Sequence, residues 1–257
     1  MNPNFKSEQQ LIEYLNKKVI QYNTKDFIDT DPIQLPHLFS KKEDIEIVAL
    51  IISTIAWGNR TSIINNGKKL LEIMQHSPHE FINNYSDELA KDLKFVHRTF
   101  NYQDLDFFFR SLQNIYLTSN LEQAFSPHPS IFGANGRIIN FRTRFFETEH
   151  DNRSEKHVSN PLKNSAAKRL NMFLRWLCRK DENGVDFGIW NSIPLSELNV
   201  PLDVHTATVG RKLGLITRKQ NDGKTLEELM EQLRRFDPND PSKYDFALFG
   251  IGAFEGK

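Results

Sequence analysis

The chain reads Val200-Pro201-Leu202-Asp203-Val204-His205 at the point where a short apolar and basic helix begins. Asp203 stands where a helix N-cap belongs, after Pro201 and before apolar residues at helical spacing. A carboxylate there accepts backbone N–H bonds and is stabilised by the positive end of the helix. Two interpretations follow: Asp203 is an ordinary helix cap, or it is a rigidly held charge aimed into a cleft.

A second helix upstream supplies a partner for this carboxylate. Residues 166–178 have a strong amphipathic pattern, and Lys168 lies near their start, 35 positions before Asp203 (168 against 203). An amine can attack an electrophilic sugar carbon when burial or neighbouring cations deprotonate it, and Arg169 and Lys163 supply such cations. An opposing carboxylate can stabilise an oxocarbenium ion or take a proton. The pair suits cleavage of an N-glycosidic bond; otherwise Lys168 is a surface lysine on a basic helix.

Helical periodicity extends along most of the chain, so we predict an all-α fold. The apolar run at residues 42–57 also permits a buried strand, although its length and its alanines favour a central helix. Residues 24–40 are expected to form a loop, and residues 147–160 a mobile surface loop. Further helices are predicted at residues 7–22, 61–74, 104–116, 203–213, 225–236 and 241–251.

Charge and cysteine content narrow the class of function. The 257 residues include 33 Lys plus Arg and 33 Asp plus Glu, so an anionic partner has to be met by a local patch. The run from Lys163 to Lys180 is such a patch, or else a solvated helix face. A single cysteine, Cys178, excludes an internal disulfide and a Cys-ligated zinc or iron–sulfur site. We predict no metal and no cofactor.

The N-terminal residues do not have the pattern of a signal peptide. No apolar run approaches the roughly 20 residues that span a bilayer. From these two observations we expect a soluble, cytoplasmic protein without a membrane partner.

The motif at residues 200–205 resembles the catalytic-aspartate motif of the helix–hairpin–helix DNA glycosylase superfamily. This superfamily includes endonuclease III-like enzymes. The motif is most similar to that of the 8-oxoguanine glycosylase branch. The resemblance implies an all-α fold, a catalytic carboxylate at Asp203 and a Schiff-base lysine at Lys168. The spacing of these two residues is comparable to that in archaeal 8-oxoguanine glycosylases. Residues 168–176, Lys-Arg-Leu-Asn-Met-Phe-Leu-Arg-Trp, also resemble an uncharacterised bacterial family of similar length.

The hairpin of that superfamily normally reads Leu-Pro-Gly-Val-Gly before the lysine, and its glycines let backbone N–H groups approach a DNA phosphate. Residues 161–167 here read Pro-Leu-Lys-Asn-Ser-Ala-Ala, without glycine. Small residues still permit a close approach, but a left-handed backbone at Ala166 would cost about 1–2 kcal/mol. Because the hairpin is altered, the motif at residues 200–205 supports the fold with more force than it supports the activity.

The resemblance also implies contacts to nucleic acid. His205 would lie near the DNA backbone or the substrate, and Lys163 and Arg169 would engage phosphates. Trp57 could stack on an extruded base, and Asn59 and Arg60 could contact the extruded strand. The alternatives are a core tryptophan and ordinary helix-end residues.

We therefore expect two helical subdomains with a cleft between them: residues 41–180, and residues 1–40 with 181–257. The leading hypothesis is a DNA glycosylase, with or without lyase activity, that flips an oxidised purine out of duplex DNA. A catalytically silent nucleic-acid-binding protein of the same fold is the alternative. A helical enzyme or scaffold without salt-dependent nucleic-acid affinity is a third. The sequence sets neither the lesion, the opposite base nor the oligomeric state.

Overall fold

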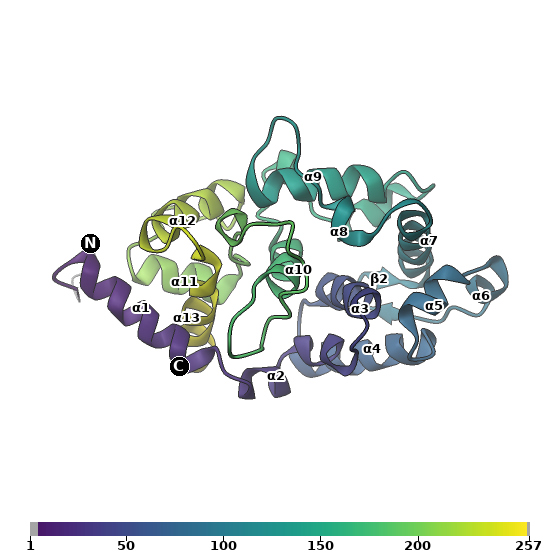
Figure 1. The fold of residues 1–257 in the computed structure, drawn as a ribbon, viewed down its shortest axis with the longest axis horizontal. Coiled ribbons are helices and arrows are strands. Elements are labelled where there is room, and N and C mark those ends of the chain that lie inside the picture. The colour runs from purple at the N-terminus through teal and green to yellow at the C-terminus, as the bar shows by residue number, and fades with distance from the viewer. Residues whose placement is uncertain (1–4, 256–257) are drawn as a thin grey trace. The chain divides into compact units, whose positions relative to one another are not determined.

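The computed structural model describes residues 5–255, and most of them are helical (Figure 1), which confirms the all-α prediction. In residues 5–255 the sheet consists of two short antiparallel strands, β1 (Val96–His97) and β2 (Phe100–Asn101). The α-helices are α1 (Glu8–Tyr22), α2 (Asp26–Thr30), α3 (Lys42–Ile55), α4 (Arg60–Ile73), α5 (Pro78–Asn83), α6 (Asp87–Lys91), α7 (Tyr102–Thr118), α8 (Leu121–Ala124), α9 (Gly133–Phe145), α10 (Lys168–Cys178), α11 (Val204–Lys212), α12 (Gly223–Phe236) and α13 (Tyr244–Gly250).

Short 3₁₀ helices connect several of these elements. They are η1 (Pro32–Gln34), η2 (Pro36–Leu38), η3 (Asn152–His157), η4 (Pro161–Lys163), η5 (Leu195–Glu197) and η6 (Pro241–Lys243). One π-helical turn, η7 (Ile251–Glu255), follows α13 directly.

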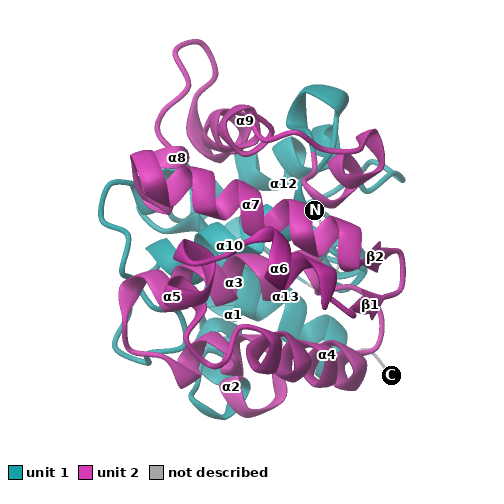
Figure 2. Cartoon of the chain, turned by 90° about the vertical axis from the view of Figure 1, so that its right-hand side faces the viewer, with its two compact units in different colours: residues 1–27, 160–257 teal, residues 28–159 magenta. Residues whose placement is uncertain are grey.

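The chain forms two compact units, coloured separately in Figure 2. Unit 1 combines Met1–Phe27 with Asn160–Lys257, and unit 2 is Ile28–Ser159. The sequence-based division placed residues 41–180 in one subdomain, and residues 1–40 with 181–257 in the other. Residues 160–180 lie in unit 1 rather than in the central unit, and residues 28–40 lie in unit 2.

Asn164 shows why the segment before α10 belongs to unit 1. Its main-chain oxygen accepts a hydrogen bond from the Gly223 N–H at 2.8 Å, and its side-chain oxygen accepts one from the Lys224 N–H at 3.1 Å. Its side-chain amide donates to Asp222 Oδ2 at 3.1 Å. The hairpin is therefore tied to the start of α12.

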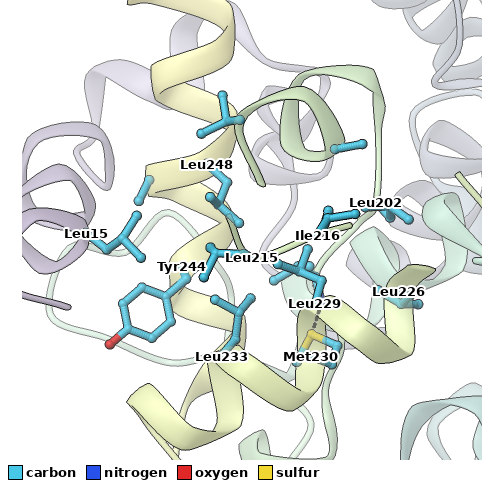
Figure 3. Packing of buried hydrophobic residues seen from close by; sticks show 14 of the residues in the cluster. Leu15, Leu202, Leu215, Ile216, Leu226, Leu229, Met230, Leu233, Tyr244 and Leu248 are labelled. Atoms are coloured by element: carbon cyan, nitrogen blue, oxygen red, sulfur yellow. Dashed lines mark hydrogen bonds between the residues drawn. The ribbon is translucent and has the colours of Figure 1, made fainter. Parts of the chain in front are cut away.

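The core of unit 1 gathers residues from α1, α11, α12 and α13 (Figure 3). Val200 and Leu202, the apolar residues just before Asp203, are part of this core, with 0% and 4% of their surface exposed. The Val200 N–H also donates to Met230 Sδ on α12 at 3.3 Å. Burial of these two side chains holds the backbone that presents Asp203.

The core of unit 2 is built around α3. Every residue from Ile45 to Ile55 is buried, which confirms a central helix and rules out the alternative of a strand. The helix ends before Gly58, which has a φ of +99°, a left-handed conformation that glycine tolerates. A Cβ at Gly58 would lie 2.7 Å from Arg98 Nη1, so the flexible end of the Arg98 side chain would have to shift.

Two segments expected to be loops are more ordered than their composition indicates. Residues 24–40 contain α2, η1 and η2. The prediction of a mobile surface loop at residues 147–160 is wrong, because η3 buries Ser154 and His157. Ser154 Oγ donates to Asp104 Oδ1 at 2.7 Å, and His157 Nε2 lies 3.2 Å from Asp104 Oδ2. Asp104, fully buried in the first turn of α7, thus anchors the segment.

Candidate active site

Asp203 is the N-cap of α11, as its sequence context predicts. Its backbone is extended, and its Oδ1 accepts a hydrogen bond from the Thr206 N–H at 2.8 Å. The other oxygen, Oδ2, faces Lys168. Only 12% of the Asp203 side chain is exposed, so the carboxylate is held in one orientation and largely shielded from water. One oxygen satisfies the helix, and the other is available for chemistry.

Lys168 is the first residue of α10, and its Nζ lies 3.7 Å from Asp203 Oδ2. This is an ion-pair distance, yet it exceeds the usual length of an N–H···O hydrogen bond. The lysine side chain is 37% exposed, so a ligand can reach the amine from solvent. The structure therefore brings together the two residues that the sequence paired across 35 positions.

The hairpin before α10 has left-handed backbone at two residues that are not glycine. Asn164 has φ 58° and ψ 29°, and Ala167, the residue that precedes the helix, has φ 43° and ψ 40°. Ala166 is not among the residues with positive φ. Asparagine tolerates this conformation well, whereas an alanine there costs about 1–2 kcal/mol. The Asn171 side-chain amide donates to the Ala166 carbonyl at 2.9 Å and so holds the turn from within α10.

The amino end of α10 has no side-chain cap. Its first N–H groups and the helix dipole therefore present positive potential beside Lys168. Lys163 is exposed in η4 at the tip of the hairpin. Arg169 is partly exposed, and burial lowers its pKa to about 10, within the range where it remains a cation at neutral pH. These groups form a local basic surface within unit 1.

The carboxyl-terminal half of the predicted basic run does not belong to that surface. Arg175 and Arg179 are 3% and 4% exposed and are engaged by carboxylates from elsewhere in the chain. Arg175 Nε donates to Asp186 Oδ1 at 3.2 Å, and Arg179 Nε donates to Asp240 Oδ2 at 2.9 Å. The expectation that the run from Lys163 to Lys180 engages phosphates is wrong for these two arginines, because their charges are neutralised internally.

Arg175 also leads to a residue that the sequence did not identify. Its Nη1 donates to Oδ2 of Asp245, a carboxylate on α13 that is 5% exposed. Burial, together with the negative charges of Asp203 and Asp186, raises the pKa of Asp245 to about 7, against the opposing charges of Arg175 and Lys168. Asp245 is thus electrostatically coupled to the Lys168–Asp203 pair. No local pattern around Asp245 distinguishes it from an ordinary helical aspartate.

His205 is the second residue of α11, two positions after Asp203, and it is exposed. Its ring makes an edge contact with Phe249, with centroids 5.8 Å apart. The backbone of η7 approaches it closely, because a Cβ at Gly252 would lie 2.8 Å from His205 Cβ. The imidazole is therefore positioned by α13 and η7 while remaining accessible.

The other predicted contact residues, Trp57, Asn59 and Arg60, lie in unit 2 at the turn between α3 and α4. Asn59 caps α4 by accepting a hydrogen bond from the Ser62 N–H at 3.1 Å, and Arg60 begins that helix. Trp57 is half-buried. Its ring stacks on His157 with centroids 6.1 Å apart and meets His97 edge-on at 5.0 Å. Each of these three residues thus has a structural role in its own unit.

Within residues 5–255, no group of three or more His, Cys, Asp or Glu side chains is arranged to hold a metal ion. In the same part of the chain, no helix combines the length and the apolar character needed to cross a bilayer.

Comparison with known proteins places the chain in a family. Residues 31–254 match the model of a family described as a protein of unknown function, DUF2400. The chain belongs to the DUF2400 family. No curated protein and no solved structure matches it. The DUF2400 match covers both Lys168 and Asp203 and most of the two compact units.

Proposed function

We propose that this DUF2400 protein is a DNA glycosylase with lyase activity that removes a damaged, oxidised purine. Lys168 Nζ forms a bond to the anomeric carbon C1′ as the bond from C1′ to the base nitrogen breaks. The base departs with the bonding electrons and takes up a proton. The attacking nitrogen then loses a proton and forms a double bond to C1′, as the C1′–O4′ bond breaks and O4′ takes up a proton; the product is a protonated Schiff base on the opened sugar. Asp203 stabilises the positive charge that develops at C1′ and accepts a proton from the amine.

The observation that carries this proposal is the distance of 3.7 Å between Lys168 Nζ and Asp203 Oδ2. The two groups stand at the amino ends of successive helices in one unit, and each has a second feature that suits its role. The carboxylate is shielded and oriented by its cap, and the amine is accessible. A lysine and a carboxylate can catalyse several reactions together. Among these, the resemblance of residues 200–205 to the glycosylase motif favours cleavage of an N-glycosidic bond.

The surface next to the pair supports an anionic substrate. The uncapped start of α10 offers backbone N–H groups, and Lys163 and Arg169 add positive charge. Phosphate contacts of this kind produce a steep fall of affinity with salt. Because Arg175 and Arg179 are neutralised, we expect only a modest phosphate contribution, from the hairpin and the start of α10.

Borohydride trapping on duplex DNA containing oxidised guanine tests the proposal. Borohydride reduces a Schiff base to a stable amine, so the protein becomes covalently attached to DNA. We expect an adduct with the wild type, and at least about a 100-fold loss of it in Lys168→Ala and in Asp203→Asn. Lys224→Ala, which removes an exposed lysine of the same unit, is the matched control and should trap normally. No adduct, or an adduct that persists in Lys168→Ala, would contradict the lyase activity.

One observation favours a catalytically silent nucleic-acid-binding protein as a second candidate. The hairpin lacks glycine, and both polar ends of the Asn164 side chain are engaged by the start of α12. Such a hairpin could persist as a binding element without catalysis. Duplex binding that survives Lys168→Ala and Asp203→Asn, without release of a base from a panel of lesions, distinguishes this candidate.

A further inference from the structure

Asn171 is a fully buried polar residue, the fourth of α10, and the proposed reaction does not use it. Its side-chain amide donates to the Ala166 carbonyl at 2.9 Å, across the start of the helix. Its side-chain oxygen has no hydrogen-bond partner within residues 5–255. A buried acceptor without a partner destabilises a fold, so the stability of the helix does not account for an asparagine at this position. What the side chain contributes is its bond to Ala166.

This bond spans the turn through which the chain enters α10. Ala167 is left-handed there, with φ 43° and ψ 40°, although its Cβ disfavours that conformation. The segments on both sides are fixed, because Asn164 is bonded to the start of α12 and Leu170 of α10 is 3% exposed in the core. Ala167 can therefore leave the left-handed conformation only if the hairpin moves or the first turn of α10 unwinds.

The first turn of α10 is the weaker of these two segments. Three hydrogen bonds join Asn164 to the start of α12, whereas the amino end of α10 has no side-chain cap. Strain at Ala167 is therefore relieved most easily by unwinding this turn, whose first residue is Lys168. Unwinding would move the Lys168 amine from its position 3.7 Å from Asp203 Oδ2. The Asn171 side chain opposes this movement, because its bond closes the turn from within the helix.

We infer that Asn171 is a positioning residue for Lys168: its bond across the start of α10 keeps the strained turn wound and so holds the amine opposite Asp203. Ser165 assists, because its Oγ accepts a hydrogen bond from the Ala167 N–H at 3.2 Å. The value of this position for catalysis rests on the proposed function. The position itself does not, because it depends only on contacts within unit 1.

Carbodiimide cross-linking of the folded protein tests the position without DNA. The reagent activates a carboxylate, and an amine in contact with that carboxylate displaces the reagent as a urea and forms an amide bond. The readout is the yield of the Lys168–Asp203 cross-link divided by that of Lys243–Asp237, another ion pair of unit 1. Asn171→Ala should lower this ratio about fivefold or more, because the two groups are no longer held together.

Glycine at position 167 separates positioning from a general loss of stability. Glycine adopts a left-handed backbone without the penalty of a Cβ, so the turn no longer tends to unwind. When Ala167→Gly is added to Asn171→Ala, the ratio should return to within about twofold of the wild-type value. A loss of packing around residue 171 would not be restored in this way. If Asn171→Ala does not fold, Ser165→Ala replaces it and should likewise lower the ratio alone and regain it with Ala167→Gly.

Borohydride trapping of the same variants connects the position to the reaction. Under single-turnover conditions with saturating protein, Asn171→Ala should slow formation of the trapped adduct about 10-fold or more, while the Kd for the DNA duplex changes by less than about twofold. Ala167→Gly should restore the rate, because it removes the strain that displaces Lys168.

An unchanged cross-link ratio in Asn171→Ala would overturn the inference. So would a loss that Ala167→Gly leaves in place, a wild-type protein without the Lys168–Asp203 cross-link, or an adduct that Asn171→Ala forms at the wild-type rate. Because cross-linking uses no substrate, its result is independent of borohydride trapping. Cross-linking as expected without any trapped DNA would retain the role of Asn171 and contradict the proposed glycosylase activity.

Discussion

One carboxylate oxygen of Asp203 caps α11, and the other faces Lys168. The sequence predicted this position because a carboxylate before a helix is a recognisable cap. The structure adds that the buried Val200 and Leu202 fix its backbone. That Lys168 lies opposite Asp203 could be predicted only on a condition, because it depends on how α10 and α11 pack against each other.

Substitution of Asp203 separates the two roles. Asparagine is also a good N-cap, so Asp203→Asn should leave the free energy of unfolding within a few tenths of a kcal/mol. Asp203→Ala removes the cap and should cost about 1 kcal/mol. Urea denaturation measures both values, and the trapping assay should fail in both variants. A full trapping signal in Asp203→Asn would mean that the residue serves the helix alone.

The burial of Arg175, Arg179 and Asp245, and the ion pairs that they form, could not be predicted from the sequence. The run from Lys163 to Lys180 has no acid, so Arg175 and Arg179 resemble surface cations. Their partners, Asp186, Asp240 and Asp245, become neighbours only through tertiary packing. Charge patterning along a chain describes local sequence and does not report such long-range neutralisation.

At the scale of elements, the helices were predictable wherever apolar residues recur with helical spacing, as in α1 and α10. The ordering of η3 was not, because it depends on a buried carboxylate, Asp104, in a different helix. The hairpin before α10 shows a similar limit. Its missing glycines suggested strain at Ala166, whereas the left-handed residues are Asn164 and Ala167.

Glycine substitution at the hairpin tests this assignment. In Ala167→Gly the left-handed backbone no longer carries a Cβ, which relieves about 1–2 kcal/mol and exceeds the added entropy of the unfolded chain, about 0.5–1 kcal/mol. We expect a protein that is unchanged or up to about 1 kcal/mol more stable. Ala166→Gly, whose backbone is not left-handed, is the matched control and should lose about 0.5–1 kcal/mol. Equal losses of thermal stability in the two variants would refute the left-handed assignment.

At the scale of the whole molecule, the sequence predicted one central unit and one built from both ends of the chain. The boundaries were harder to place, because a change in composition marks a linker but does not show which core a segment joins. Residues 160–180 contain the basic helix that we grouped with the centre. Their contacts to α12 and α13, through Asn164 and Arg175, place them in unit 1.

The ionic network of unit 1 predicts how stability changes with pH. A carboxyl whose pKa is raised in the folded state stabilises the fold below its unfolded pKa, near 4, and this contribution is lost as pH rises to about 7. Asp245→Asn removes that loss while its amide oxygen can still accept a hydrogen bond from Arg175. Relative to the wild type, its free energy of unfolding should rise by on the order of 2–4 kcal/mol between pH 4.5 and 7.5.

Urea titrations of both proteins at several pH values measure this difference. Groups with lowered pKa values, such as Asp181 and Asp237, have the opposite dependence but are present in both proteins, so they cancel. A difference between the two proteins that does not vary over the whole range would contradict the assignment to Asp245.

The pairing of α1 with α13 in unit 1 has a consequence for synthesis of the protein. The two helices pack together, with Gly250 so close to the Tyr22 ring that a Cβ would lie 2.2 Å from it. Unit 2 and most of unit 1 are translated between them, which takes on the order of tens of seconds at ordinary elongation rates. During that time the apolar face of α1 lacks its α13 partner, so unit 2 can fold before unit 1 is complete.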